Sequence, residues 1–517
     1  MGSFYVTTAI PYVNAAPHLG FALELVQADV LARYHRLLGD DTWFLTGTDE
    51  NSLTNVLSAE EAGVPVRTLV ERHAEIFRAL TGTLGISNDD FIRTSAEPRH
   101  RAGAERLWRA CAAAGDIYRQ HYRGLYCVRC ERFYAVDELV DGTCPEHHIA
   151  PEVVEEENYF FRLSRYAEPL AALLDSGALR VVPAWRHQEV RAFLAGGLND
   201  FSISRTQARA RGWGIPVPGD AEQVMYVWFD ALANYITALG YGGAEPRLSR
   251  SWLDNPARVH VIGKDIVRFH AVYWPAILLS AGLPAPSRII VHGFLTRDGS
   301  RMSKTLGTGV DPIALVQDWG TDAVRYWLLR EVPPGDDADF TEAGFARVYN
   351  ADLANDLGNL LQRTVSLLHR ARAGVVRGGV WDAPSPLASA VAEVPEALRR
   401  GLGDDWDPRR ALDAIFAVVR AGNRRVEETK PWVLLRAERD GDLEAGRRLD
   451  AALAELAEAL RVVAEALRPL LPHTAERIAS QLGVTPAARW WEALRWGGLP
   501  AGTRVVAPQA LFPRRPA

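Results

Sequence analysis

The sequence predicts an α/β protein with a parallel sheet, an insertion within that sheet, and an all-α domain after it. Alternating strand and helix patterns open the chain and return after about residue 224. A turn-rich segment between them holds three of the four cysteines. After about residue 333, apolar residues recur almost only at helical spacing. A chain of 517 residues is too long for one hydrophobic core, so we expect several domains.

The first elements predict one half of a nucleotide-binding sheet. The apolar run "FYVTTAI" at residues 4–10 is typical of a buried strand, and residues 21–38 carry apolar side chains at helical spacing before Gly39. The run "DTWFLTGTDE" at residues 41–50 predicts a second strand that ends in a polar turn. Strand, helix and strand in this order favour a parallel sheet.

The whole chain divides into segments of different character. We expect the first half of the sheet in residues 1–117 and its second half in residues 224–332. Residues 118–223 form the expected insertion, residues 333–348 a linker, and residues 349–517 a bundle of amphipathic helices.

Composition and charge limit the class of protein. Apolar residues make up 48% and charged residues 24%, which is ordinary for folded domains. The net charge of −6 argues against a uniformly basic nucleic-acid binder but allows a local basic face. No stretch approaches the roughly 20 apolar residues of a membrane span, and the chain starts as a strand without a signal peptide. We therefore expect a cytoplasmic protein.

The cysteine spacing predicts a metal site within the insertion, at about residues 120–155. Three thiols and an imidazole form two pairs of C-x2-C and C-x2-H spacing, with thirteen residues between the pairs: Cys127, Cys130, Cys144 and His147. Four such ligands fit a closed, tetrahedral, structural zinc ion. His148 is an alternative fourth ligand. Cys111 lies in a helical run, where we expect a buried apolar residue.

Two short motifs point to phosphate chemistry. His18, Leu19 and Gly20 lie where the first strand gives way to the helix, and the N–H groups of a helix N-terminus attract phosphate. Lys304, in the loop "DGSRMSKTLG", suits closure over the β- and γ-phosphates of a nucleotide. Taken alone, the first motif is also compatible with an ordinary strand-helix turn, and a lysine on an exposed loop is usually only solvated. Their combination in a split sheet favours a nucleotide-activating site.

The chain resembles the class I aminoacyl-tRNA synthetases, and among them the methionyl-tRNA synthetase family, over nearly its whole length. Seven blocks in the family's order carry the resemblance: "AIPYVNAAPHLG", "FLTGTDE", "YCVRCERFYAVDELVDGTCPEH", "YVWFDALANY", "VIGKDIVRFHAVYWPA", "HGFLTRDGSRMSKT" and "NADLANDLGNLLQR". The resemblance implies a split Rossmann-like sheet, an insertion with a zinc knuckle, a stem-contact linker and a helical-bundle anticodon-binding domain.

The resemblance also implies roles for individual residues. Five residues would contact ATP: His18, Gly20, Asp265, Arg301 and Lys304. Three of them, His18, Arg301 and Lys304, would also be catalytic, because they would stabilise charge in the transition state. Asp49 would hold the α-ammonium group of the amino acid. A mainly aromatic set would form or gate its side-chain pocket: Ile10, Tyr12, Trp228, Leu232, Tyr235, Phe269, His270 and Trp274. For each aromatic residue alone, core packing is the alternative interpretation.

The resemblance places an anticodon site in the helical region. Asn359 and Arg363, four residues apart on one helix face, would bond base edges, and Trp432 would stack on a splayed base of the CAU anticodon. An ordinary polar pair and a tryptophan docked on the bundle are the alternative interpretation.

Four positions depart from the family's motifs. Phe21 replaces the second histidine of the first block, Asn51 and Ser52 stand where His-Gly is usual, and Arg301 replaces a lysine with the charge kept. Loss of one preorganised charge-stabilising donor typically costs about 10²–10³ in rate, so Phe21 carries the largest expected effect. Ser52 would matter if its backbone required a positive φ.

The implied function is that of a methionine–tRNA ligase. It would activate L-methionine with ATP and Mg²⁺ to methionyl-adenylate, transfer the acyl group to tRNA(Met), and carry a structural Zn²⁺. Two alternatives remain: a paralogue that transfers an activated amino acid to a small molecule, and a non-catalytic tRNA-binding protein. The chain ends at "PQALFPRRPA", soon after the helical region, which predicts a monomer.

Overall fold

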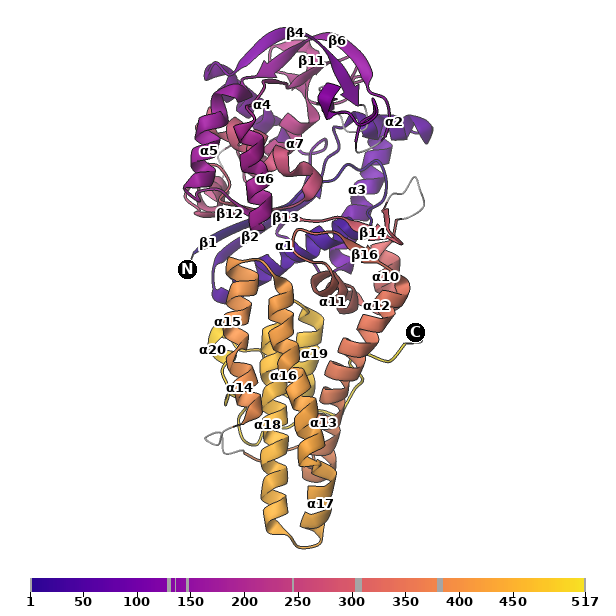
Figure 1. The fold of residues 1–517 in the computed structure, drawn as a ribbon, viewed down its shortest axis with the longest axis vertical. Helices are drawn as coiled ribbons and strands as arrows, with labels where there is room; N and C mark the ends of the chain where they lie inside the picture. Colours follow the sequence, from indigo (N-terminus) through magenta and orange to yellow (C-terminus); the bar gives the residue numbers. More distant parts are fainter. Residues whose placement is uncertain are drawn as a thin grey trace. The chain divides into compact units, whose positions relative to one another are not determined.

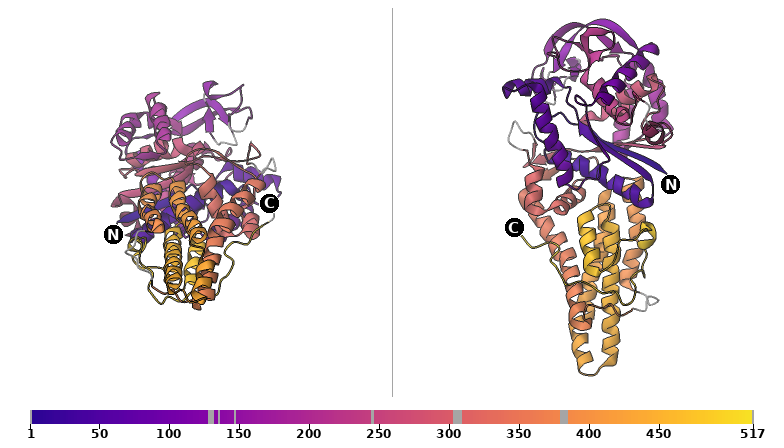
Figure 2. Two further views of the ribbon diagram at one scale, coloured as in Figure 1. Left: turned by 60° about the horizontal axis from the view of Figure 1, so that its bottom comes forward. Right: turned by 180° about the vertical axis from the view of Figure 1, so that it is seen from behind.

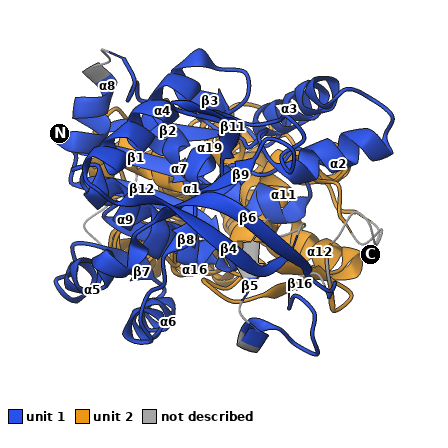
Figure 3. Cartoon of the chain, turned by 90° about the horizontal axis from the view of Figure 1, so that it is seen from above, with its two compact units in different colours: residues 1–28, 41–292 blue, residues 29–40, 293–517 orange. Residues whose placement is uncertain are grey.

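A computed structural model of the protein (Figure 1) describes residues 2–127, 132–134, 136–145, 148–243, 246–302, 309–378 and 385–515. Figure 2 shows the same ribbon from two further sides. The chain divides into two compact units, one of residues 1–28 and 41–292 and the other of residues 29–40 and 293–517 (Figure 3).

The first unit is built on a six-stranded parallel sheet with the order β3-β2-β1-β12-β13-β7. Its strands, in chain order, are β1 (Ser3–Thr8), β2 (Asp41–Thr48), β3 (Asp90–Arg93), β7 (Arg180–Val182), β12 (Ala257–Gly263) and β13 (Arg288–His292). The predicted strands at residues 4–10 and 41–50 are confirmed as β1 and β2. In the centre of the sheet, Tyr5 pairs with Trp43 on one side and with Arg258 on the other. The two halves of the sheet therefore meet between β1 and β12.

Helices that connect these strands supply the apolar core of the first unit. They are α1 (Leu19–Leu38), α2 (Leu53–Glu61), α3 (Val66–Thr83), α4 (Pro98–Ala113), α5 (Ala167–Asp175), α6 (Ala184–Ala195), α7 (Val227–Thr237), α8 (Pro246–Leu248) and α9 (Trp274–Ser280), with short 3-10 or π segments η1 (Val136–Glu138), η2 (Leu163–Tyr166), η3 (Ser249–Leu253), η4 (Lys264–Ile266) and η5 (Phe269–Tyr273). The largest cluster joins the sheet to α4 and α7 through Trp108 and Phe229, whose rings meet edge to face at 5.3 Å.

The segment expected as an insertion, residues 118–223, forms two antiparallel sheets and also supplies β7. One sheet has the order β5-β4-β6-β8, and the other the order β10-β11-β9. Their strands are β4 (Ile117–Cys127), β5 (Arg132–Tyr134), β6 (Glu152–Phe161), β8 (Phe201–Ser202), β9 (Ser204–Thr206), β10 (Pro216–Val217) and β11 (Asp220–Met225). Through β7, which pairs with β13, this segment also provides the edge strand of the main sheet.

The second unit is mostly helical, as the periodicity after residue 333 predicts. Its helices are α10 (Pro312–Trp319), α11 (Thr321–Glu331), α12 (Glu342–Val348), η6 (Tyr349–Gly358), α13 (Asn359–Arg372), α14 (Pro386–Ala392), α15 (Val394–Leu398), η7 (Arg399–Asp404), α16 (Pro408–Thr429), α17 (Pro431–Arg439), α18 (Leu443–Leu467), α19 (Pro472–Leu482) and α20 (Trp490–Ala493). A small sheet of β14 (Leu295–Arg297), β15 (Ser300–Arg301) and β16 (Ala338–Phe340) completes the unit.

The long helices of the second unit run alongside one another (Figures 1 and 2). Helices α12, η6 and α13 follow one another without a break from Glu342 to Arg372. Helix α18 begins at an Asp442 cap, whose carboxylate accepts the N–H groups of Glu444 and Ala445. Within the described ranges, we find no helix with the length and hydropathy that a membrane span requires.

Candidate active site

The candidate active site of the first unit lies at the carboxyl ends of β1 and β12. These two strands are neighbours, and the strand order runs outward from them in opposite directions. In open α/β sheets, a ligand binds in the crevice outside the carboxyl ends of the strands at such a switch point. Asp265 lies in the turn directly after β12, and His18 directly precedes α1 in the connection that follows β1, so the segments after two adjacent strands carry two of the expected ATP-contacting residues.

His18 is folded back onto the first turn of α1. The N–H of Gly20 donates to Nδ1 of His18 at 3.0 Å, and the His18 carbonyl accepts the N–H of Phe21. A Cβ at residue 20 would lie 2.8 Å from Cε1 of His18, so only glycine permits this ring position. Because Nδ1 accepts, the neutral ring carries its hydrogen on Nε2 and can donate it to an anionic ligand.

Asp265 lies in the 3-10 turn η4, directly after β12, and is exposed. A Cβ at Gly263 would lie 2.8 Å from Oδ1 of Asp265, so the glycine leaves room for this carboxylate beside the strand end. An exposed carboxylate at a strand end is well suited to accept hydrogen bonds from ribose hydroxyl groups.

A buried carboxylate that sequence reasoning missed lies beneath this edge of the sheet. Glu24 of α1 accepts the N–H of Ala9 at 2.6 Å, and its other oxygen lies 3.0 Å from Nε2 of His292, at the end of β13. Burial raises the pKa of Glu24, and the neighbouring His292 partly offsets this. The only available signal was a glutamate within the apolar run "FALELV", which marks a polar group inside the core.

Asp49 lies in a tightly held turn after β2. Its N–H donates to the carbonyl of Pro11 at 2.9 Å, and its carbonyl accepts Nδ2 of Asn55 at 3.1 Å. The next residue, Glu50, is fully buried and pairs with Arg93 at 2.7 Å. All four residues from Asp49 to Ser52 are buried. This turn therefore presents the Asp49 carboxylate from a fixed backbone.

The residues expected to form the side-chain pocket lie largely on two neighbouring helical segments, α7 and η5. Trp228 and Phe269 are stacked, with ring centroids 3.8 Å apart and an angle of 8° between the ring planes. The His270 ring lies edge-on to Trp228 at 6.5 Å, and Trp274 lies 6.0 Å from Tyr235. Leu232 is buried in the same cluster, and Ile10 packs against it. Tyr12 forms an isolated parallel β-bridge with Asp49 through the backbone.

His270 is a neutral imidazole, and a hydrogen bond at each ring nitrogen fixes the orientation of its ring. Nδ1 lies 2.9 Å from the Ile266 carbonyl, which only accepts, so Nδ1 carries the hydrogen. Nε2 therefore accepts the hydroxyl hydrogen of Tyr235 at 2.7 Å. Complete burial lowers the pKa of His270 to about 4 and raises that of Tyr235 well above its usual range. Both side chains thus remain uncharged near neutral pH, which suits a pocket for an apolar thioether.

The structure gives physical roles to two departures from the family's motifs. Phe21 packs edge to face on Phe77 at 5.3 Å, at the border of a small apolar cluster with Val13. Ser52 is the N-cap of α2 with φ of −75°, and it accepts the N–H of Asn55. The backbone at Ser52 therefore requires no glycine. Arg301 belongs to β15 in the second unit, and Lys304 falls outside the described residues.

Two of the four expected zinc ligands are described and lie in one small buried cluster. Cys127, at the end of β4, and Cys144 share this cluster with Tyr134, whose hydroxyl oxygen lies 3.4 Å from Sγ of Cys144. Cys130 and His147 fall outside the described residues. His148, the alternative ligand, is exposed. Cys111 is buried and donates to the Ile277 carbonyl, as expected for a residue of the core.

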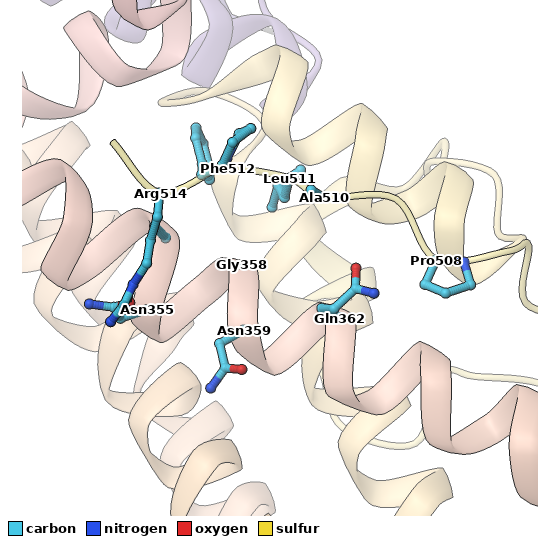
Figure 4. A pocket seen from close by; sticks show the side chains of 11 residues that line it. Asn355, Gly358, Asn359, Gln362, Pro508, Ala510, Leu511, Phe512 and Arg514 are labelled. Carbon is cyan, nitrogen blue, oxygen red and sulfur yellow. The ribbon is translucent and has the colours of Figure 1, made fainter. Parts of the chain in front are cut away.

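The three expected anticodon residues lie in the second unit. The Arg363 guanidinium is 5.8 Å from the ring centroid of Trp432 and pairs with Glu427 at 2.7 Å. Trp432 is 42% exposed, which is unusual for so large an apolar side chain. Asn359, one helical turn before Arg363, lines a cavity of about 750 Å³ between its helix and residues 508–514 (Figure 4). Arg363 and Trp432 therefore lie close together, and Asn359 lies one turn away on the same helix as Arg363.

Two families of known proteins match this chain, one over its N-terminal part and one over its helical C-terminal part. The family described as "tRNA synthetases class I (M)" matches residues 4–150 and 147–365, and the "Anticodon binding domain of methionyl tRNA ligase" matches residues 386–515. The parallel sheet, with candidate nucleotide contacts at its switch point, is thus that of a class I aminoacyl-tRNA synthetase.

Individual proteins that are similar over the whole chain belong to the same family. The chain is 43% identical over 517 residues to the methionine–tRNA ligase of Brucella suis, covering 99% of this chain and 98% of that protein. It is 44% identical to the enzyme of Mesorhizobium japonicum, covering 99% and 97%. The solved Mycobacterium tuberculosis methionyl-tRNA synthetase in complex with methionyl-adenylate matches with a TM-score of 0.92 and 41% identity, covering 99% of this chain and 100% of that one. The chain belongs to the methionyl-tRNA synthetase family and is an ATP-dependent aminoacyl-tRNA ligase.

Proposed function

We propose that the chain joins methionine to tRNA(Met) in two steps, using the residues described above. A carboxylate oxygen of methionine attacks the α-phosphorus of ATP, and the bond to the bridging oxygen of the β-phosphate breaks, which releases pyrophosphate. A hydroxyl group of the terminal adenosine of the tRNA then takes the acyl group, and AMP leaves. The observation that supports the proposal is that one compact unit carries His18 folded onto Gly20, the buried Asp49 turn, and the hydrogen-bonded pair of Tyr235 and His270.

The ATP contacts are proposed from the ends of the central strands and from the "RMSKT" loop. Nε2 of His18 would donate to the phosphates, and the exposed Asp265 would accept hydrogen bonds from the ribose. Gly20 would leave room for the nucleotide at the helix N-terminus. Arg301 and Lys304 would stabilise the charge that develops on the departing pyrophosphate, together with the Mg²⁺ that neutralises the phosphates when bound.

The amino acid contacts are proposed from Asp49 and the aromatic pocket. A buried carboxylate is a strong partner for an ammonium group that has been removed from water. The stacked Trp228 and Phe269 offer a flat apolar wall, and sulfur makes favourable contacts with aromatic rings. Preorganised orientation of this kind supplies much of the rate without a general base.

The RNA contacts are proposed from the surface around Trp432. Trp432 would stack on an unpaired base, and Arg363 and Asn359 would bond base edges. Residues 333–348 would contact the stem, residues 349–517 would bind the anticodon, and the catalytic domain would comprise residues 1–117 and 224–332. A function without tRNA would have no use for such a surface.

A structural Zn²⁺ is proposed in the insertion, residues 118–223. Cys127 and Cys144 are buried together in a cluster too small to be stable on its own, which fits a segment held by a metal. Cys130 and His147 would complete the ligand set. When bound, the ion would supply folding stability and no catalytic step. A cytoplasmic location and a monomeric state are also proposed, and sedimentation at low micromolar concentration tests the latter.

Two assays on one preparation test the proposed function. Methionine-dependent exchange of pyrophosphate into ATP reports the first step, and charging of a tRNA(Met) transcript reports both steps. We expect both activities. Exchange without charging would favour a small-molecule acceptor, and absence of both would favour a binding protein.

The anticodon surface is tested by Trp432→Ala, with Val433→Ala as the matched control because Val433 is an exposed neighbour. We expect Trp432→Ala to lower kcat/KM for tRNA by about fivefold to 150-fold, since stacking is worth about 1–3 kcal/mol per base. The exchange reaction should not change. Equal charging by the two variants would contradict the proposed stacking.

A further inference from the structure

A chain of buried polar groups joins the turn after β2 to helices α7 and α4. Nδ2 of Asn51 donates to Oδ2 of Asp230 at 2.7 Å, and Oδ1 of Asp230 lies 2.6 Å from Nε2 of His100. Nδ1 of His100 lies 2.8 Å from Oγ1 of Thr237. Asn51 is 9% exposed, and the other three residues are fully buried. None of these four residues is among the proposed contacts to ATP, methionine or tRNA.

Both ends of the connection adjoin groups proposed to bind the amino acid. The backbone N–H of Asn51 donates to Oδ1 of Asp49 at 3.3 Å. Asp230 lies on α7, which also carries Trp228 and Tyr235. A single residue, Asn51, therefore contacts the candidate ammonium-binding carboxylate through its backbone and the pocket-bearing helix through its side chain.

We propose that Asn51 is a positioning residue that fixes the distance between Asp49 and the methionine side-chain pocket on α7. The inference rests on the proposed function, because it takes Asp49 and α7 as the two ends of the amino acid site. Methionine presents its ammonium group and its thioether at opposite ends, so both contacts form at once only if the two elements keep one separation. Buried polar groups tolerate few alternative geometries, because an unpaired carboxylate inside the protein is costly.

The position of Asn51 distinguishes a positioning role from a general contribution to stability. A comparable buried pair, Glu458 with Arg461, lies within the helical bundle and binds the N–H groups of Gly497 and Gly498. That pair adjoins none of the proposed amino acid contacts. Asn51 instead bridges two elements that each carry one of those contacts. A change in the bridge should therefore affect methionine binding more than ATP binding.

The side-chain chemistry at residue 51 allows a charge-exchange test. Asn51→Leu removes the donor and keeps the same number and branching of side-chain heavy atoms. Asn51→Asp places two carboxylates in contact, and like charges at that distance cannot both ionise without a large cost. The double variant Asn51→Asp with Asp230→Asn reverses the polarity of the hydrogen bond, since an amide at residue 230 can donate to residue 51 and still accept from His100. Asn51→His keeps a ring donor close to the position of the amide nitrogen.

The experiment measures KM and kcat for methionine and KM for ATP in ATP–pyrophosphate exchange, with thermal unfolding of each variant. We expect Asn51→Leu and Asn51→Asp to raise KM for methionine about tenfold to a hundredfold, as for a lost hydrogen bond to a charged group. KM for ATP should stay within about twofold. The double variant and Asn51→His should recover most of the loss. Glu61→Gln, an exposed change on α2, is the control.

The outcomes separate the inference from the proposed function. Absence of methionine-dependent exchange in the unaltered protein would overturn the proposed function. With that exchange intact, unchanged KM values in Asn51→Leu would overturn the inference alone. Equal rises in KM for methionine and for ATP, without recovery in the double variant, would assign the network to stability only and would also overturn it.

Discussion

The hydroxyl of Tyr235 donates to Nε2 of His270 at 2.7 Å, while Nδ1 of His270 faces the Ile266 carbonyl at 2.9 Å. Tyr235→Phe would leave a buried acceptor without a partner, which typically costs about 1–3 kcal/mol. We expect a lower free energy of unfolding and a rise in KM for methionine of about threefold to tenfold. Urea unfolding and the exchange assay measure the two effects. An unchanged KM for methionine would show that this hydrogen bond does not contribute to methionine binding.

Burial of His270 predicts loss of stability in acid. Its pKa is about 4 in the folded protein, below the ordinary value of 6.5, so the unfolded chain binds the proton more readily between these values. The stability contribution is complete above pH 6.5 and is lost as the pH falls toward 4. From this group alone, we expect a loss of about 2 kcal/mol between pH 7.5 and pH 5.

Urea unfolding of His270→Gln at both pH values checks this expectation. The variant should lose less stability in acid than the unaltered protein, whereas His473→Gln, at an exposed position, should not differ from it. An equal acid-dependent loss in His270→Gln would show that other groups dominate.

Phe21 acts as a packing residue in the structure, so restoring the family's histidine should not increase the rate. The ring pair with Phe77 is worth about 0.5–1.5 kcal/mol, and Phe21→His would weaken it. We expect about 1 kcal/mol less stability and a change in kcat of exchange below about threefold, against the 10²–10³ that a missing donor would cost. Phe21→Leu controls for the loss of the ring. A rise in kcat of a hundredfold would contradict this account of Phe21.

Zinc content should depend on the clustered cysteines. We expect about one zinc ion per chain in the purified protein and little in Cys127→Ser, because three ligands hold a structural zinc poorly. Cys111→Ala, at a buried thiol outside the cluster, should keep its zinc. Elemental analysis of the three proteins measures this. Equal zinc in all three, or none in any, would contradict the proposed metal site.

The strands of the fold were predictable because buried parallel strands are continuous apolar runs with polar ends. "FYVTTAI" and "DTWFLTGTDE" contain β1 and β2, and the part of the chain where the alternating pattern returns, after about residue 224, contains β12 and β13. The strand β7 was not predictable in the same way. It has three residues, lies within a segment of antiparallel strands, and joins the main sheet only through its pairing with β13. Such pairing depends on tertiary contacts that a local pattern does not contain.

Parts of the candidate site were predictable where the residues that contact each other lie within one short motif. The fold of His18 onto Gly20 takes place within three residues, and the i,i+4 spacing of Asn359 and Arg363 places both on one helix. The network of Asn51, Asp230 and His100 joins residues more than a hundred positions apart. Asn51 departs from the family's motif, but nothing in the sequence around any of the three residues indicates its partner. Only the folded chain reveals that they touch.

The central proposal is that His18 and Lys304 act on one bound nucleotide. A double-mutant cycle with His18→Ala and Lys304→Ala, measured by kcat of ATP–pyrophosphate exchange, tests it most directly. We expect each single change to lower kcat by about 10²–10³, with KM for methionine nearly unchanged. The double variant should lose less than the product of the two single losses, as for groups that serve the same charge. Full activity in Lys304→Ala, or losses that multiply completely, would contradict the account.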